Sequence, residues 1–223
     1  PDPIVRRNCV IALGQMKTAT DEGVPALAAA LKPRKTDNPR DRALEEEVRH
    51  MAAEAFSHIG YPLNKAAIPA IREALARDPN QDVRLRLVEA LFQLKDLDGE
   101  DMTKTLLGVL DETDMDEPHV LVRYNVARLF AKAKGDSAPD KAVDTLLHMI
   151  NNRKIRVFYD TKAKSKDGIT ESSKGMTTTE ASTGGDARFM AAEAMGWMGN
   201  KSKNDKRVVE ALEKATEDAD LDL

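Results

Sequence analysis

The chain has few of the residues that build thick globular cores or covalent cross-links. Aromatic residues make up 4% of its 223 residues, and Cys9 is its single cysteine. One cysteine cannot form an internal disulfide, so packing must hold the fold together. The apolar neighbours of Cys9 in the helical pattern described below predict a small core residue. Scarce aromatics beside 41% hydrophobic residues favour closely stacked helices over one thick core.

The sequence also lacks long hydrophobic runs and a strong charge of one sign. No apolar run approaches the roughly 18 residues of a membrane span, so we expect a soluble protein, with a cytoplasmic location favoured. A formal net charge of -4 excludes a chain built mainly to neutralise nucleic-acid phosphates. There is no signal-peptide pattern, but the chain opens Pro-Asp-Pro without Met. A targeting segment upstream stays an open alternative.

Motifs that carry catalysis or metal binding are missing as well. There is no Gly-x-Ser-x-Gly elbow and no phosphate-binding glycine loop after a strand. Residues Asp96–Gly99 place their Gly fourth rather than sixth for a calcium loop, which predicts a turn. The pairs Glu47/His50 and Asp144/His148 each supply two ligands where a metal needs three or four. We therefore predict surface pairs, no catalytic or metal-binding residue, and no cofactor.

The sequence does contain one thirteen-residue pattern in five copies. In each copy, positions 1, 5, 8, 9 and 12 are apolar, a spacing that draws one stripe along a helix. Position 2 is always arginine. The copies begin at Val5, Val48, Val83, Val122 and Ala187, and their arginines are Arg6, Arg49, Arg84, Arg123 and Arg188. The pattern predicts five amphipathic helices, which we call Val-Arg helices.

A second helical pattern alternates with the first. Its origins lie 19 to 21 residues after each Val-Arg origin, at positions 24, 68, 103, 143 and 208. The offset from this second helix to the next Val-Arg helix varies from 15 to 44 residues. All length variation therefore falls on one type of connection. In a stacked array, connections of one type lie along one edge.

The alternation of Val-Arg-x-x-Ala-Ala-x-Ala-Leu-Gly with Val-Pro-Ala-Leu resembles HEAT repeats, particularly the HEAT-like repeats also found in phycobilisome lyases. The resemblance covers nearly the whole chain outside residues 151–185. It implies an all-α fold, a right-handed α-solenoid of about five helix pairs, in a single domain over residues 1–223. In this family the Val-Arg helix is the second of each pair and lines the concave face. We therefore expect a start in mid-repeat and apolar surface at both ends, covered by further repeats or by partners.

Residues 151–185 form an insertion of different character. Residues 154–159 alternate as in a strand, Asp167-Gly168 is a turn signal, and Ile169 to Glu171 could return, which predicts a β-hairpin insertion followed by a flexible loop. Residues 151–175 hold seven basic and three acidic residues, and residues 32–42 on the same edge hold five basic and two. The insertion is either an arm that grips an acidic protein or a phosphate backbone, or a solvated protrusion. Its candidate contacts are Lys154, Arg156, Phe158, Tyr159, Lys162 and Lys164.

The Val-Arg helices carry a second set of candidates. Positions 4, 7 and 11 share a face away from the stripe, and this mixed face is plausible as a concave groove for a protein partner. Its candidates are Glu54, Glu89 and Trp197, with Trp197 either an anchor for the partner or a packing residue. We expect the five arginines to be structural, each bonding a carboxylate or turn carbonyl nearby. The alternative is a basic ladder for anions.

These features favour a non-enzymatic scaffold that binds another protein through the concave face and the decorated edge. Two alternatives stay open. The family resemblance allows a lyase or isomerase acting on a bilin, although three Tyr and one Trp are few for a pigment pocket. The basic insertion allows nucleic-acid binding, whose affinity would fall steeply with salt.

Overall fold

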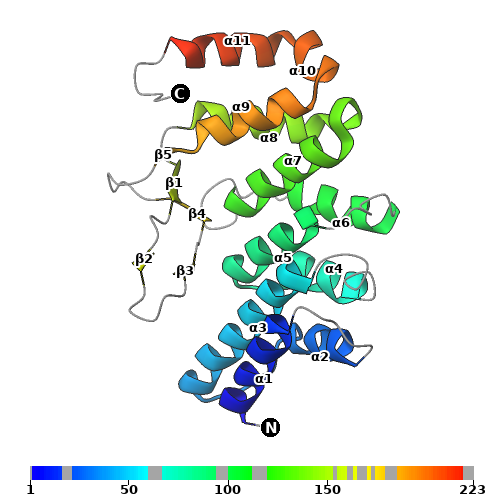
Figure 1. Cartoon of the computed structure of the whole chain (residues 1–223). Helices are drawn as coiled ribbons and strands as arrows, with labels where there is room; N and C mark the ends of the chain where they lie inside the picture. Colours follow the sequence, from blue (N-terminus) through cyan, green and yellow to red (C-terminus); the bar gives the residue numbers. More distant parts are fainter. Residues whose placement is uncertain are drawn as a thin grey trace. The chain divides into compact units, whose positions relative to one another are not determined.

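The computed structural model shows a helical protein made of two compact units, residues Pro1–Thr113 and Asp114–Leu223. It describes residues 2–16, 22–59, 67–93, 100–111, 120–152, 155–159, 163–164, 170–171, 174–178 and 185–217. Eleven α-helices lie in these residues (Figure 1). None of these helices is long and apolar enough to cross a membrane. Each unit is treated by itself below, and the single domain over residues 1–223 stays a prediction.

Unit 1 contains two layers of helices. The Val-Arg helices pack in succession, α1 against α3 and α3 against α5, while α2, α4 and α6 pack beside them as a second layer (Figure 1). The first layer comprises α1 (Pro3–Gln15), α3 (Pro39–Ile59) and α5 (Gln81–Gln93), and the second comprises α2 (Gly23–Ala30), α4 (Ile68–Arg77) and α6 (Glu100–Leu110). This is the predicted alternation of two helix types. One boundary differs, because α3 begins at Pro39, inside the segment 32–42 that the sequence assigned to a connection.

Side-chain caps start the Val-Arg helices in unit 1. The Asp2 carboxylate accepts from the backbone N–H of Ile4 at 2.7 Å and of Val5 at 3.4 Å, and Pro3 occupies the first turn. At α5, Asn80 Oδ1 accepts from the N–H of Asp82 at 2.8 Å. These bonds satisfy amides that the first turn leaves without helical partners.

The predicted stripe forms the core of unit 1. In α3 the side chains of Val48, Ala52 and Phe56 are fully buried, and α5 buries Val83, Leu87 and Leu91 in the same way. Small residues bring the helices close together. A Cβ added at Gly14 of α1 would lie 2.9 Å from Ala55 Cβ of α3, so this position has no room for a side chain.

The same stripe is exposed on α1. Val5 is 56% exposed, and Cys9 on the next turn is exposed too. The prediction that Cys9 is a core residue is therefore wrong. Its counterpart Ala52 in α3 is buried, and the neighbouring Ala55 packs on α1, but in the described residues nothing covers this face of α1. The periodicity identified the stripe correctly but could not show which copies are covered.

Unit 2 repeats the alternation with one addition. α7 packs against α8 and α9, and α8 also packs against α9 and α11. The short helix α10 was not predicted; it precedes α11, whose Val208 is buried as expected. The elements are α7 (Val120–Lys134), the 3-10 helix η2 (Gly135–Ser137), α8 (Asp140–Asn151), α9 (Arg188–Trp197), α10 (Asn200–Asn204) and α11 (Lys206–Thr216).

Short paired strands lie between α8 and α9. β1 (Ile155–Tyr159) pairs antiparallel with β4 (Lys174–Thr178) and with β5 (Gly185–Asp186). The pair formed by β2 (Ala163–Lys164) and β3 (Thr170–Glu171) is also antiparallel. The return strand predicted at 169–171 thus pairs with β2 rather than with β1, because Thr178 to Lys174 takes the register opposite Ile155 to Tyr159. The hairpin insertion as a folded arm stays a prediction.

Candidate functional site

The arginines at position 2 of the Val-Arg helices turn inward and hold neighbouring elements together. Arg6 of α1 pairs with Glu45 of α3. Arg49 donates from Nε to Asp78 Oδ2 at 2.7 Å and from Nη2 to Oδ1 at 3.4 Å, with both side chains buried. Arg84 donates to the Leu75 carbonyl at 2.8 Å. A planar donor suits these bonds, and the prediction of structural arginines is confirmed at these three positions.

The two arginines of unit 2 occupy the same kind of position. Arg123 is 1% exposed and Arg188 is 4% exposed. A ladder that binds anions needs guanidinium groups open to solvent, and these two are closed to it. The alternative interpretation of the five arginines as a basic ladder is therefore wrong, and the faces available to a partner are formed by other positions.

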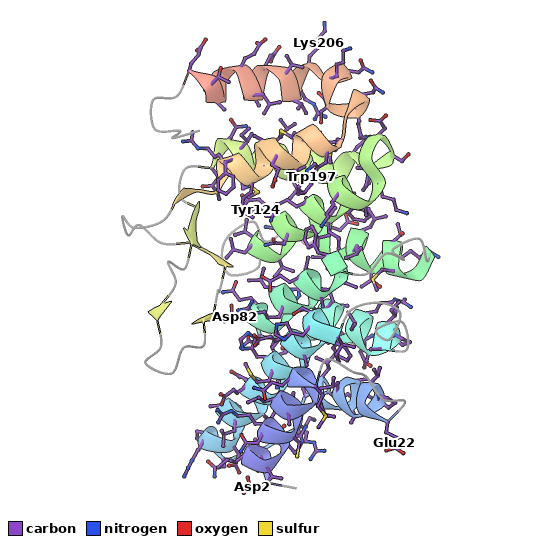
Figure 2. The ribbon with its side chains drawn as sticks, viewed as in Figure 1. Asp2, Glu22, Asp82, Tyr124, Trp197 and Lys206 are labelled. Carbon is purple, nitrogen blue, oxygen red and sulfur yellow. The ribbon has the colours of Figure 1, made fainter. Side chains whose placement is uncertain are left out.

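In unit 1, polar side chains from α3 and α5 form one linked cluster. Arg86 Nε donates to His50 Nε2 at 3.1 Å, and Arg86 Nη1 contacts Glu89 Oε2 at 2.8 Å. Asp82 and Glu54 lie close enough to act on the charge of His50, and Figure 2 labels Asp82 near the start of α5. We call His50, Glu54, Asp82, Arg86 and Glu89 the unit 1 face. The bond to Arg86 fixes the position of an otherwise flexible guanidinium.

Burial sets the protonation state of His50. Burial lowers the pKa of His50 from its usual value, and the positive charge of Arg86 lowers it further. The carboxylates of Glu54, Asp82 and Glu89 oppose this shift without reversing it. His50 is therefore neutral at pH 7, which leaves Nε2 free to accept from Arg86. Counting the carboxylates against Arg86, the unit 1 face has a formal charge of -2.

In unit 2, the corresponding helices present an aromatic residue. Trp197 of α9 is 36% exposed, and Figure 2 labels it on the face of α9 beside α7. Arg128 of α7 places its Cζ 5.9 Å from the centroid of the Trp197 ring, within the range of a cation–π contact. Arg128 also pairs with Glu193 at 3.7 Å and donates to Asn125 Oδ1 at 3.3 Å. We call Asn125, Arg128, Glu193 and Trp197 the unit 2 face.

The structure describes only part of the predicted contact set. Glu54 and Glu89 lie in the unit 1 face and Trp197 in the unit 2 face. For Arg156, Phe158 and Tyr159 in β1 and for Lys164 in β2 only the backbone is described. The other two predicted contacts, Lys154 and Lys162, lie outside the described residues.

Six residues of these faces were not selected as candidates from the sequence: His50, Asp82, Arg86, Asn125, Arg128 and Glu193. Arg86 and Arg128 occupy positions 4 and 7 of the Val-Arg pattern, and His50 occupies position 3. The helical period of the pattern already places positions 3, 4 and 7 on the side of the helix away from the apolar stripe. The hydrogen bond between Arg86 and His50, 36 residues earlier, could not be predicted from the sequence, because it depends on how α3 and α5 pack.

The members of the two carboxylate–histidine pairs contact other side chains. Glu47 pairs with Arg7 at 2.9 Å, and His50 accepts from Arg86 as described above. Asp144 pairs with Arg207 at 2.8 Å, while His148 Nδ1 lies 2.6 Å from the hydroxyl of the buried Tyr124. No group of three possible metal ligands occurs in the part of the chain that the structure describes.

Comparison with known families gives two matches, both to repeats of paired helices. Residues 39–117 match the model described as HEAT repeats, and residues 5–33 match the model described as PBS lyase HEAT-like repeat. Together these ranges span α1 to α6. A search of curated proteins found no match.

Proposed function

The chain is a HEAT-repeat protein, and we propose that it is a non-enzymatic scaffold that binds another protein. In this proposal the unit 1 face and the unit 2 face are each a contact surface on the concave side of their own helices, within the right-handed solenoid of about five helix pairs that the HEAT resemblance implies. The basic insertion at 151–185 would be a hairpin that adds a second contact, to an acidic segment of the same partner. The resemblance to HEAT repeats supports this arrangement, because stacked repeats leave one side of each inner helix free for ligands.

The observation that carries the proposal is the exposure of Trp197. A tryptophan buries more apolar area on binding than most side chains, and such residues dominate the energy of protein interfaces. Here Arg128 contacts one region of the ring and Glu193 and Asn125 hold Arg128 in place. The ring is therefore ordered before a partner arrives, so binding costs little side-chain entropy.

The unit 1 face supports the same proposal through its charge. Glu54 and Glu89 are partly exposed carboxylates on adjacent helices, and Arg86 is already occupied by His50 and Glu89. A basic or polar segment of a protein partner would find carboxylate acceptors there. This complementarity would set orientation and association rate more than affinity.

The test compares two exposed apolar residues of unit 2. Trp197 is 36% exposed and Val209 of α11 is 37% exposed, so Val209→Ala is a matched control for Trp197→Ala. Proteins that co-purify with the wild-type chain at constant ionic strength are identified and quantified by mass spectrometry. We expect Trp197→Ala to lower recovery of the partner about tenfold, the effect of losing an aromatic anchor, while Val209→Ala keeps it.

Two results would contradict the proposal. One is a partner that Trp197→Ala and Val209→Ala recover equally well. The other is the absence of any protein enriched over a control resin, at a scale where the wild-type chain stays folded by circular dichroism.

A further inference from the structure

The second helix layer of unit 1, formed by α2, α4 and α6, contains a pocket that lies outside the contact surfaces proposed above. It has a volume of 340 Å³ and lies between the end of α2 and one side of α4. Its apolar lining comes from Leu31 and Pro33 at the end of α2 and from Ala70 and Ala74 on α4. Pockets that bind small groups start at about 300 Å³, so this one has room for one Leu or Phe side chain.

Small side chains and a chain turn create this space. Ala70 and Ala74 are four residues apart on α4, so they lie on the same side of the helix. α2 ends at Ala30, and Pro33 follows three residues later, where it cannot continue the helix. Leu31 and Ala74 are buried and form the floor.

The rim of the pocket is basic. Lys32 and Arg77 are exposed lining residues, and within the described residues neither side chain has an ion-pair partner. Arg34 and Lys35, which follow Lys32 in the chain, are exposed as well. The acids at the pocket are Glu73 and Asp78, but the charge of Asp78 is already neutralised by its buried pair with Arg49 at 2.7 Å.

We propose that this pocket binds one apolar side chain of an acidic linear peptide segment. The apolar floor takes the side chain, and Lys32 and Arg77 contact carboxylates on either side of it. Charge complementarity identifies the class of ligand: counting Lys32, Arg77 and Glu73, the lining has a formal charge of +1, and Arg34 and Lys35 raise the local charge to +3. The site lies on α2 and α4, so it does not depend on the two faces of the Val-Arg helices.

The probe is a fluorescein-labelled peptide of the sequence Ser-Glu-Asp-Leu-Phe-Asp-Glu-Ser, titrated with the full chain by fluorescence anisotropy at about 0.15 M salt, where long-range attraction is screened. Two further peptides accompany it. One replaces Leu-Phe with Ser-Ser, and the other replaces every acidic residue with lysine. We expect saturable binding of the first peptide and a loss of at least tenfold in affinity for each of the others.

Two pairs of variants locate the binding. Ala70→Phe fills the pocket, and Ala76→Phe adds the same ring to an exposed position of α4 as its control. The double reversal Lys32→Glu/Arg77→Glu removes the basic rim. Lys203→Glu/Lys206→Glu in unit 2 changes the net charge equally and is the control. We expect Ala70→Phe and the rim reversal each to weaken binding about tenfold, and each control to weaken it less than about twofold.

Three outcomes would overturn the assignment. The first is no saturable binding of the acidic peptide up to about 1 mM. The second is equal binding of the Ser-Ser peptide, which would show attraction by charge alone. The third is an Ala70→Phe chain that keeps its helical circular dichroism and binds as the wild type does.

Discussion

The two units use one helix pattern to present two different surfaces. In unit 1 the exposed side of the Val-Arg helices holds an arginine between a histidine and a carboxylate, Arg86 with His50 and Glu89. In unit 2 it holds Arg128 between a carboxylate and an indole ring, Glu193 and Trp197. Position 2 is arginine in both units and is buried at four of its five copies, so the pattern separates residues that build the stack from residues on the other side of the helix.

The largest expected effect tests whether a buried arginine pair stabilises unit 1. Asp78→Ala leaves Arg49 buried without its carboxylate, and an unpaired buried charge costs about 3–5 kcal/mol. We expect urea unfolding followed by circular dichroism to show this loss in unit 1. Glu210→Ala, at an exposed site of α11, should change stability by less than about 0.5 kcal/mol.

A transition in Asp78→Ala that matches the wild type would show that Arg49 finds another acceptor. If the unfolding curve instead splits into two steps, the units unfold separately, and the undisturbed step belongs to unit 2.

The second prediction concerns a turn of unit 2. Gly199 has a φ of +54°, and a Cβ added there would lie 2.7 Å from Asp136 Oδ1, the atom that accepts from Asn200 N–H. Gly199→Ala should therefore cost about 1–3 kcal/mol. Gly196 lies in α9 with no atom within 4 Å of such a Cβ, so Gly196→Ala should be neutral or stabilise by up to about 1 kcal/mol. Thermal unfolding of the two variants measures the difference, and equal melting temperatures would contradict the role given to this turn.

The third prediction compares the histidines of the two units. Burial lowers the pKa of His50, with Arg86 as the second cause, and burial lowers the pKa of His148, with Arg123 as the second cause. A histidine whose pKa is lower in the folded state favours folding above its unfolded pKa of about 6.5. That contribution is lost as the pH falls through 6.5 toward the folded value, because the unfolded chain then binds more protons.

We therefore expect the free energy of unfolding to fall when the pH is lowered from 7.5 to 5.5. His50→Gln and His148→Gln should each make this fall smaller. Urea unfolding of the wild type and both variants at the two pH values measures this. A wild-type chain that is more stable at pH 5.5 than at pH 7.5, with this gain lost in the two variants, would contradict the predicted direction of the pH dependence.

The smallest expected effect concerns the insertion. Replacing residues 153–184 by a short Gly/Ser linker removes β1 to β4 and leaves every described helix in place. Because α8 and α9 pack against each other directly, we expect the helical circular dichroism to stay nearly intact and stability to change by less than about 1 kcal/mol. Collapse of the helical signal would show that the insertion is part of the core of unit 2.

The sequence predicted features that depend on period and on local bonds. The apolar stripe of α3 and α5 and the inward arginines follow from spacing along one helix, and the structure confirms them. The resemblance of the alternating motifs to HEAT repeats is confirmed by the family matches over residues 5–33 and 39–117. The location of Trp197 on the side away from the stripe also follows from the period.

Other features depend on which helix lies beside which, and the sequence does not state that. Cys9 has the spacing of a core residue but lies on a face of α1 that no described element covers. The bond between His50 and Arg86 joins residues 36 apart. The pocket forms because the end of α2 lies beside the side of α4 that carries Ala70 and Ala74. The residue pattern of either helix alone does not predict this placement.

The Asp78 carboxylate connects more than one pair of groups. Besides its bonds to Arg49 it accepts from the backbone N–H of Asn80 at 2.9 Å, and Asn80 in turn caps α5. One acidic group thus orients the turn between α4 and α5 while it is bound to α3. A side chain therefore ties α3 to the turn that starts α5, and a ligand that moves α5 relative to α3 must compete with Arg49 for this carboxylate.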